Sequence, residues 1–148
     1  MSNVKVISQY VKDLSFECPN APQVFLNPSQ KPNINLSIDL NATKIGDDLF
    51  EIILKITADA SADKKRTFLC EITYGGAFQV KNVENEMLEQ ILLIYCPNLI
   101  FPFIRRIIAN LTTDSGFLSL MLDPIDFADL YNRRKLASEA TPINDTRN

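Results

Sequence analysis

The stretch Tyr95-Cys96-Pro97-Asn98-Leu99-Ile100-Phe101-Pro102-Phe103-Ile104-Arg105-Arg106 lies where prolines interrupt a helical pattern of apolar residues. Pro97 disfavours a continuous helix, Asn98 can accept hydrogen bonds from free helix amides, and Pro102 is tolerated best in a first turn. The sequence therefore predicts that one helix ends near Cys96 and that another begins near Leu99. Its aromatic side chains fit packing against a sheet or another subunit.

Four segments before this stretch alternate apolar and polar residues, as half-buried strands do. They cover residues 4–16, 34–41, 49–60 and 67–74, and Gly75-Gly76 is expected to end the last. Short connections between the second, third and fourth segments favour antiparallel neighbours. Because helical spacing follows these strands, the sequence predicts an α+β fold with an antiparallel sheet that has one buried face.

Strict alternation assigns the faces of the first strand. It puts Tyr10 on the side of Leu14 and Phe16, and it puts Val11 on the opposite side with Asp13.

A third helix is expected after Asp123-Pro124, which resembles an N-cap followed by a first-position proline. This helix would bury Phe127, Leu130 and Tyr131 and would carry the basic residues 133–135 in its last turn. The polar segment 138–148 is expected to be a disordered tail after a single domain covering residues 1–137.

Residues 19–32 contain four prolines and predict a long crossing loop. The loop holds the apolar triplet Val24, Phe25 and Leu26, which either tucks under the fold or faces a ligand. Tucking under is the commoner arrangement.

Composition limits the kind of protein this chain can be. With 148 residues, 46% of them hydrophobic, the chain can form one domain with a substantial core. A net charge of −3 and a pI near 4.9 argue against nucleic acid as a partner. Three cysteines without a paired motif suit a reducing compartment. The N-terminus has no signal-peptide pattern and no apolar run is expected to span a membrane, so the sequence indicates a cytoplasmic protein.

Motifs for catalysis and cofactors are missing from the sequence. Four glycines cannot form a dinucleotide fingerprint or a phosphate-binding loop, and the absence of histidine removes the usual zinc sites and histidine-based mechanisms. Asp47-Asp48 fits a turn better than a pair of catalytic carboxylates. The sequence predicts neither an enzyme nor a cofactor or metal site.

Five blocks of sequence carry a family resemblance. The run Lys12-Asp13-Leu14-Ser15-Phe16-Glu17-Cys18-Pro19-Asn20-Ala21-Pro22 resembles the opening motif of the SecB export chaperones. Four further blocks follow in the order of that family: Phe68-Leu69-Cys70-Glu71, Gly75-Gly76-Ala77-Phe78, Tyr95-Cys96-Pro97-Asn98 and Phe101-Pro102. The resemblance covers the chain from about Tyr10 to Tyr131.

Resemblance to SecB implies a four-stranded antiparallel sheet with helices packed on one face, assembled as a homotetrameric dimer of dimers. It implies an ATP-independent cytoplasmic chaperone that holds unfolded preproteins and delivers them to the SecA ATPase, without membrane insertion. A chaperone dedicated to one partner, such as an antitoxin, and a small domain that binds an apolar ligand remain as alternatives.

The resemblance also assigns sites. It implies that the basic C-terminal tail of SecA docks on Asp13, Glu17, Leu69 and Glu71, whose other reading is an ordinary solvated face. Client segments would contact Val24, Phe25, Leu26, Ile34, Leu36, Ile38, Phe101 and Phe103, although each could also be a core residue. Cys70, Ile72 and Tyr74 match positions associated with tetramer assembly.

Overall fold

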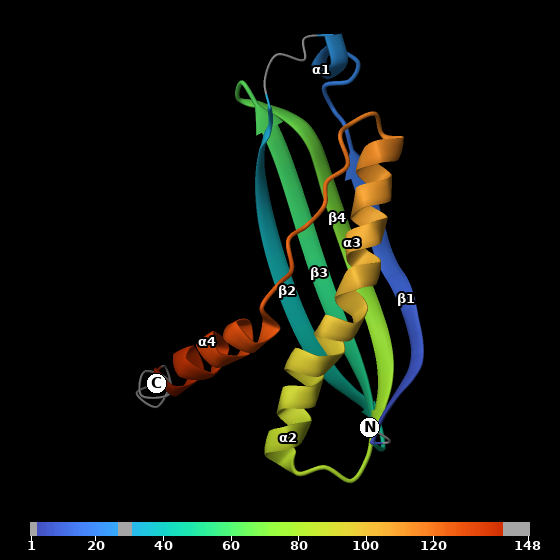
Figure 1. The fold of residues 1–148 in the computed structure, drawn as a ribbon, viewed down its shortest axis with the longest axis vertical. Coiled ribbons are helices and arrows are strands. Elements are labelled where there is room, and N and C mark those ends of the chain that lie inside the picture. Colours follow the sequence, from blue (N-terminus) through green and yellow to red (C-terminus); the bar gives the residue numbers. More distant parts are fainter. Residues whose placement is uncertain (1–2, 27–30, 141–148) are drawn as a thin grey trace, which may run out of the picture.

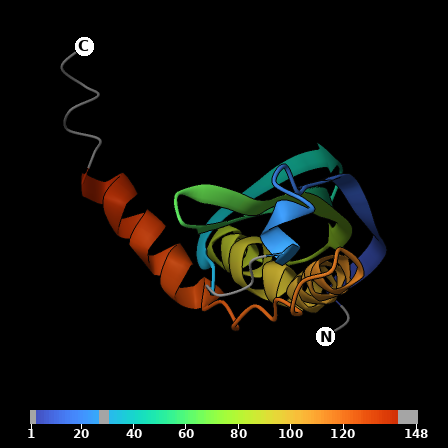
Figure 2. The same cartoon turned by 90° about the horizontal axis from the view of Figure 1, so that it is seen from above.

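The computed structural model describes residues 3–26 and 31–140, and four antiparallel strands form its single sheet. The strands are β1 (Val4–Glu17), β2 (Asn33–Gly46), β3 (Leu49–Ala62) and β4 (Lys65–Val80). Their order across the sheet is β1-β4-β3-β2, so β1 and β2 form the two edges (Figure 1). The long helical segment Asn85–Asp114 lies on one face of the sheet, which confirms the predicted fold class, whereas the C-terminal helix extends away from the sheet (Figure 2).

Tight turns fix the register of the two hairpins. Asp63 and Lys64 both have positive φ, of 52° and 62°, which is the geometry of the two-residue turn that matches strand twist. The predicted polar connection between β3 and β4 is therefore confirmed as a hairpin. Because register is fixed, alternate residues from Phe50 to Ala60 of β3 and from Phe68 to Val80 of β4 are buried on the helix side.

Two bulges in β1 make the predicted face assignment wrong. Pairing with β4 shifts register between Val6 and Ser8 and again between Val11 and Asp13. Each extra residue reverses the alternation that follows it. As a result, Tyr10 lies on the open side of the sheet with Asp13, whereas Val11 lies on the helix side.

Gly75 and Gly76 do not end β4, because the strand continues to Val80. Aromatic rings fill the space where side chains would stand. A Cβ atom on Gly75 would lie 2.4 Å from the Tyr10 ring, and one on Gly76 would lie 2.6 Å from the Phe78 ring. The glycines are therefore places of close packing within the strand rather than a turn.

The expected helix break near Cys96 is also wrong. The α2 helix (Asn85–Gln90), the π-turn η1 (Ile91–Tyr95) and α3 (Cys96–Asp114) follow one another without a loop (Figure 1). In the π-turn, the Cys96 N–H bonds to the Ile91 carbonyl. This wider turn leaves room for the ring of Pro97, which would clash in a regular α-helix.

Pro102 lies inside α3 rather than in a first turn. Because proline has no backbone N–H, Pro102 cannot donate the usual helix hydrogen bond to the Asn98 carbonyl. Both residues lie on the exposed side of the helix, where water can replace that hydrogen bond.

The uninterrupted helical segment Asn85–Asp114 is long and apolar enough to cross a membrane by length and composition alone. We expected no apolar run of membrane-spanning length, yet this helix reaches that length with an apolar composition. In this fold the segment serves as the core helix. Its buried face includes Ile100, Ile104 and Ile108, which are fully buried and pack with the sheet residues in one cluster. Each such side chain contributes about 1.5–3 kcal/mol through burial.

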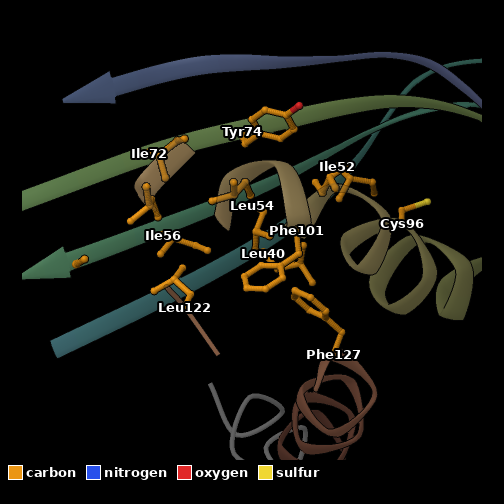
Figure 3. Packing of buried hydrophobic residues seen from close by; sticks show 14 of the residues in the cluster. Leu40, Ile52, Leu54, Ile56, Ile72, Tyr74, Cys96, Phe101, Leu122 and Phe127 are labelled. Carbon is orange, nitrogen blue, oxygen red and sulfur yellow. The ribbon is translucent and has the colours of Figure 1, made fainter. Parts of the chain in front are cut away.

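The remaining core lies between the sheet, α3 and the chain segment that follows α3 (Figure 3). Residues 115–126, here called the crossing segment, descend over the helix side of the sheet toward α4 (Figure 1). Leu122 in this segment and Phe127 at the start of α4 are buried. The rings of Phe127 and Phe101 meet edge to face at 6.1 Å between centroids.

The α4 helix (Phe127–Ala140) begins three residues later than predicted. Asp126 rather than Asp123 acts as its cap, since the Asp126 carboxylate accepts a 2.9 Å hydrogen bond from the Asp129 amide. Residues 133–135 lie mid-helix instead of in the last turn, because α4 runs to Ala140. It thus includes the first three residues of the expected tail, whereas residues 141–148 lie outside the described part of the chain.

Candidate functional site

A cavity of about 1180 Å³ opens at the α1 end of the sheet. Three segments far apart in the sequence enclose it: the loop carrying α1 (Gln23–Leu26), the β3–β4 hairpin and the crossing segment (Figure 1). Its lining residues are Asn20, Gln23, Val24, Phe25, Leu26, Lys31, Pro32, Ile34, Ala62, Asp63, Lys65, Arg66, Thr67, Phe68, Gly116, Phe117, Leu118, Ser119, Leu120 and Met121. The predicted apolar triplet of the proline-rich loop therefore faces this cavity together with Ile34.

A cluster of four phenylalanines holds the α1 loop in place. Phe16 stacks on Phe68 at 5.3 Å, Phe68 contacts Phe117 at 5.2 Å, and Phe117 contacts Phe25 at 4.9 Å between ring centroids. Gly116 has a φ of +93°, and the Phe25 ring lies 3.1 Å from where its Cβ would stand. Phe25 thus tucks against the crossing segment while part of its ring stays exposed.

Polar contacts fix the start of the same loop to β4. The Asn20 side-chain amide donates a 2.8 Å hydrogen bond to the Arg66 carbonyl, and the Cys18 thiol donates to the Thr67 carbonyl at 3.4 Å. Burial raises the pKa of the Cys18 thiol, which keeps the proton that this contact needs. One wall of the cavity is therefore anchored to the sheet.

An apolar strip on β2 continues from the cavity. Ile34, Leu36 and Ile38 lie on the helix side of the strand, yet 37%, 48% and 39% of these side chains, respectively, are exposed. Ile38 lines a second, smaller pocket of about 210 Å³ with Leu40, Leu93, Leu130 and Tyr131. The strip thus joins two hollows on one side of the sheet.

The backbone of this strip is also accessible. The Arg134 guanidinium donates a 3.1 Å hydrogen bond to the Leu40 carbonyl, which shows that Leu40 directs its backbone groups toward the outer edge. Alternate residues of a strand share this direction, so Ile34, Leu36 and Ile38 do the same. Among the described residues, no backbone hydrogen bond joins this part of the edge.

Phe101 and Phe103 do not join this surface. Phe101 is buried inside the protomer against Phe127. Phe103 is exposed. Residues two positions apart in an α-helix point about 200° apart, so Phe103 faces away from the side on which Phe101 contacts Phe127. The structure therefore brings six of the eight predicted client residues to one surface and leaves these two elsewhere.

The four predicted SecA-docking residues lie together on the open face of the sheet, opposite α3. Glu17 pairs with Leu69, Glu71 pairs with Ser15 in the next row, and Asp13 pairs with Thr73 in the row after that. Directly opposed residues share a face, so the four side chains occupy three neighbouring rows.

Asp59 extends this acidic surface to a third strand. It is paired with Leu69 from β3, so Leu69 is flanked by Asp59 on one side and Glu17 on the other. The Arg66 guanidinium holds the pKa of the Asp59 carboxyl below its usual range, which keeps it ionised. Period-two alternation along β3 could have placed Asp59 on this face, but the sequence alone does not give the register that sets it beside Leu69.

Cys70, Ile72 and Tyr74 lie on the helix side of β4, inside the protomer. Cys70 and Ile72 have no exposed surface and Tyr74 is 6% exposed. Exposed apolar side chains occur instead on the helix side of the neighbouring edge strand, at Val11 and Leu14.

The described part of the chain holds neither a cluster of metal ligands nor a buried thiolate. Residues 3–26 and 31–140 hold no group of metal-ligating side chains. Burial raises the pKa of Cys70 to about 11 and that of Cys96 to about 12, so neither is a thiolate nucleophile near neutral pH. An apolar cavity continuous with an open strand edge, with an acidic face on the other side of the sheet, is the kind of surface on which proteins bind extended polypeptides.

Comparison with known proteins identifies the family. The family model described as "Preprotein translocase subunit SecB" matches residues 1–138. The chain belongs to the SecB family, whose members are cytoplasmic, non-enzymatic chaperones of protein export. It is 50% identical over 137 residues to "Protein-export protein SecB" of Maricaulis maris, covering 93% of this chain and 79% of that protein. The corresponding protein of Parvibaculum lavamentivorans is 50% identical over 131 residues, covering 88% and 78%.

A solved structure supports the fold independently. The SecB-like chaperone of Mycobacterium tuberculosis, solved with a ChAD peptide from an antitoxin, matches with a TM-score of 0.69. The match covers 84% of this chain and 92% of that chain at 13% identity. At this identity the likeness concerns the fold, whereas the relatives that match at 50% identity are export proteins.

Proposed function

We propose that this protein holds unfolded preproteins by binding their extended segments along one surface, here called the client surface. This surface comprises the large cavity, the exposed side chains of Ile34, Leu36 and Ile38, and the smaller pocket near Leu40. The observation that carries the proposal is continuity: Ile34 lines the first cavity and Ile38 lines the second. Between them, the outward backbone groups of the edge have no backbone partner within the described part of the chain.

Two kinds of interaction act on the same client segment. Apolar side chains of the client enter the hollows, which recognise no particular sequence because they require no fixed hydrogen-bond pattern. The client backbone pairs with the outward groups of β2, in the manner of an added strand. Binding of this kind depends on the client being unfolded, since a folded domain has already paired these groups.

SecA docks on the opposite face in this proposal. Asp13, Glu17 and Glu71 supply negative charge, and Leu69 supplies an apolar contact for the basic tail of SecA. Carboxylates at a solvated surface act mainly by steering a basic partner, so this contact weakens as salt increases. Because the two surfaces lie on opposite faces of one sheet, client and SecA can be bound together.

Self-association into a dimer of dimers completes the proposal. Val11 and Leu14 on the β1 edge and Phe103 on α3 are exposed apolar residues that do not belong to the client surface. A second protomer that covers them would bury this area. Cys70, Ile72 and Tyr74 would then affect assembly indirectly, because they fix the position of α3, and would not contact the second protomer.

The test is a titration of the protein into a refolding preprotein without nucleotide, with native mass recorded on the same sample. We expect refolding to stop at a near-stoichiometric amount of tetramer. Leu36→Asp should weaken client binding by about tenfold, because it places a charge where an apolar side chain is buried by the client. Ser37→Asp is the matched control, since it adds the same charge one residue away on the opposite face of the same strand.

Equal effects of the two substitutions would refute the assignment of the client surface. Unimpeded refolding in the presence of intact tetramer would refute a general chaperone role and would favour a dedicated partner.

A further inference from the structure

Arg66 forms an ion pair with Asp59, a carboxylate of the acidic face. Its Nε and Nη2 atoms each donate a 3.0 Å hydrogen bond to Asp59, one to each carboxylate oxygen. Both oxygens of Asp59 are therefore already engaged by a cation of the same chain. Asp59 flanks Leu69 across the β3–β4 ladder, so this pair lies at the edge of the proposed SecA-docking surface rather than remote from it.

Carboxylates other than Asp59 also contribute to the electrostatic potential at Arg66. The Asp59 carboxylate raises the pKa of Arg66 most strongly, and the charges of Glu17 and Glu71 raise it further. These two glutamates are docking residues in the proposed function. The guanidinium thus lies close enough to three carboxylates of the acidic face to neutralise part of its charge.

The ion pair is exposed and replaceable. The side chains of Arg66 and Asp59 are 43% and 36% exposed, and exposed pairs of this kind contribute little to stability. The Arg66 backbone is held separately, because its carbonyl accepts the hydrogen bond from Asn20. The guanidinium can therefore leave Asp59 without disturbing the cavity wall.

We propose that Asp59 is a further docking residue for a basic peptide segment, and that Arg66 competes with this segment for it. The inference rests on the proposed docking of SecA to this face and concerns how tightly that face binds. A lysine or arginine of the partner replaces the Arg66 guanidinium on Asp59, and an apolar partner residue next to it contacts Leu69. Arg66 lowers the affinity of the free chaperone for basic segments. It thereby favours segments that present a basic residue for Asp59 together with an apolar residue for Leu69.

The experiment measures binding of a synthetic peptide that copies the basic C-terminal segment of SecA to the full-length protein. Arg66→Gln should tighten binding about two- to fivefold, the range expected for losing one exposed competing ion pair. Asp59→Asn added to Arg66→Gln should reverse that gain, because the carboxylate itself is then missing. Lys64→Asn is the matched control: it removes the same charge from the adjacent turn, where asparagine tolerates the positive φ.

The outcomes separate the two proposals. If the unmodified protein and Arg66→Gln both fail to bind the peptide, or if Glu71→Lys leaves binding unchanged, the proposed docking face is wrong and the competition falls with it. If Glu71→Lys abolishes binding while Arg66→Gln matches Lys64→Asn, the docking face stands and the competition is refuted. An unchanged affinity on adding Asp59→Asn to Arg66→Gln would refute the role of Asp59.

Discussion

Tyr10 reaches across β4 to Glu51 on β3, where its hydroxyl donates a 2.7 Å hydrogen bond to the carboxylate. The ring can cross because Gly75, the residue paired with Tyr10, has no side chain. Lys12 donates to the same carboxylate at 2.9 and 3.1 Å. These contacts join the edge strand β1 to β3 across β4, which lies between them.

Removing the Tyr10 hydroxyl should weaken this tie. Tyr10→Phe is expected to lower the free energy of unfolding by about 1 kcal/mol, the usual net value of one hydrogen bond, because Lys12 still partners Glu51. Urea unfolding at neutral pH measures this change. An unchanged midpoint would show that the hydrogen bond contributes nothing net to stability.

Alkaline pH should remove the same contribution. Folding raises the pKa of Tyr10 from 10.0 to about 12, through burial and the neighbouring Glu51. The unfolded chain therefore loses this proton first, so the contribution is complete below pH 10 and falls as pH rises toward 12. The stability difference between the unmodified protein and Tyr10→Phe should shrink across this window, as measured by chemical unfolding at each pH.

Filling the space at Gly75 should be costly. In Gly75→Ala the new methyl would lie 2.4 Å from the Tyr10 ring and 3.1 Å from Ile53, so the ring must move. We expect a loss of about 1–3 kcal/mol, typical of overpacking. Combining Gly75→Ala with Tyr10→Ala should cost less than the sum of the single changes, and strict additivity would contradict the proposed contact.

Substitutions on the acidic face should separate docking from client capture. Leu69→Arg or Glu71→Lys is expected to weaken binding of SecA at least tenfold, because each places a positive charge against a basic partner. Client capture should be unchanged, since these side chains lie on the opposite face from the client surface. Loss of both activities in an intact tetramer would contradict this division of faces.

The three thiols should differ in reactivity. Cys70 and Cys96 have no exposed surface and pKa values raised to about 11 and 12, whereas Cys18 is partly exposed. A thiol reagent should modify Cys18 first in the native protein and all three residues after denaturation. Mass mapping of the modified peptides identifies them, and rapid native labelling of Cys96 would show that α3 opens readily.

Alternation predicted the four strands because one face of the sheet is consistently buried. It failed in β1, since a bulge leaves no mark in a sequence where Ile7 and Lys12 look like ordinary strand residues. The prolines of α3 were misleading for a related reason. Whether Pro97 breaks a helix depends on the turn before it, and the apolar spacing of residues 91–95 does not distinguish a π-turn from a regular α-helical turn.

The candidate site, like the fold, could be predicted from the sequence only in part. The resemblance to the SecB family implied both the docking and the client residues, and the structure places Phe101 and Phe103 apart from the other six client residues. Their positions depend on how α3 is rotated against the sheet. Asp59 and Arg66 lie outside the motifs, and only the pairing of β3 with β4 shows that they meet the acidic face.

A protein with an open strand edge risks joining its own copies edge to edge into a growing fibre. The Arg134 hydrogen bond to the Leu40 carbonyl limits that risk. It occupies the outward carbonyl just beyond Ile38 and so bounds the stretch from Ile34 to Ile38, which is roughly 13 Å long. Such a length suits a short section of a client chain, yet it is too short to template the long, flat pairing on which polymerisation depends.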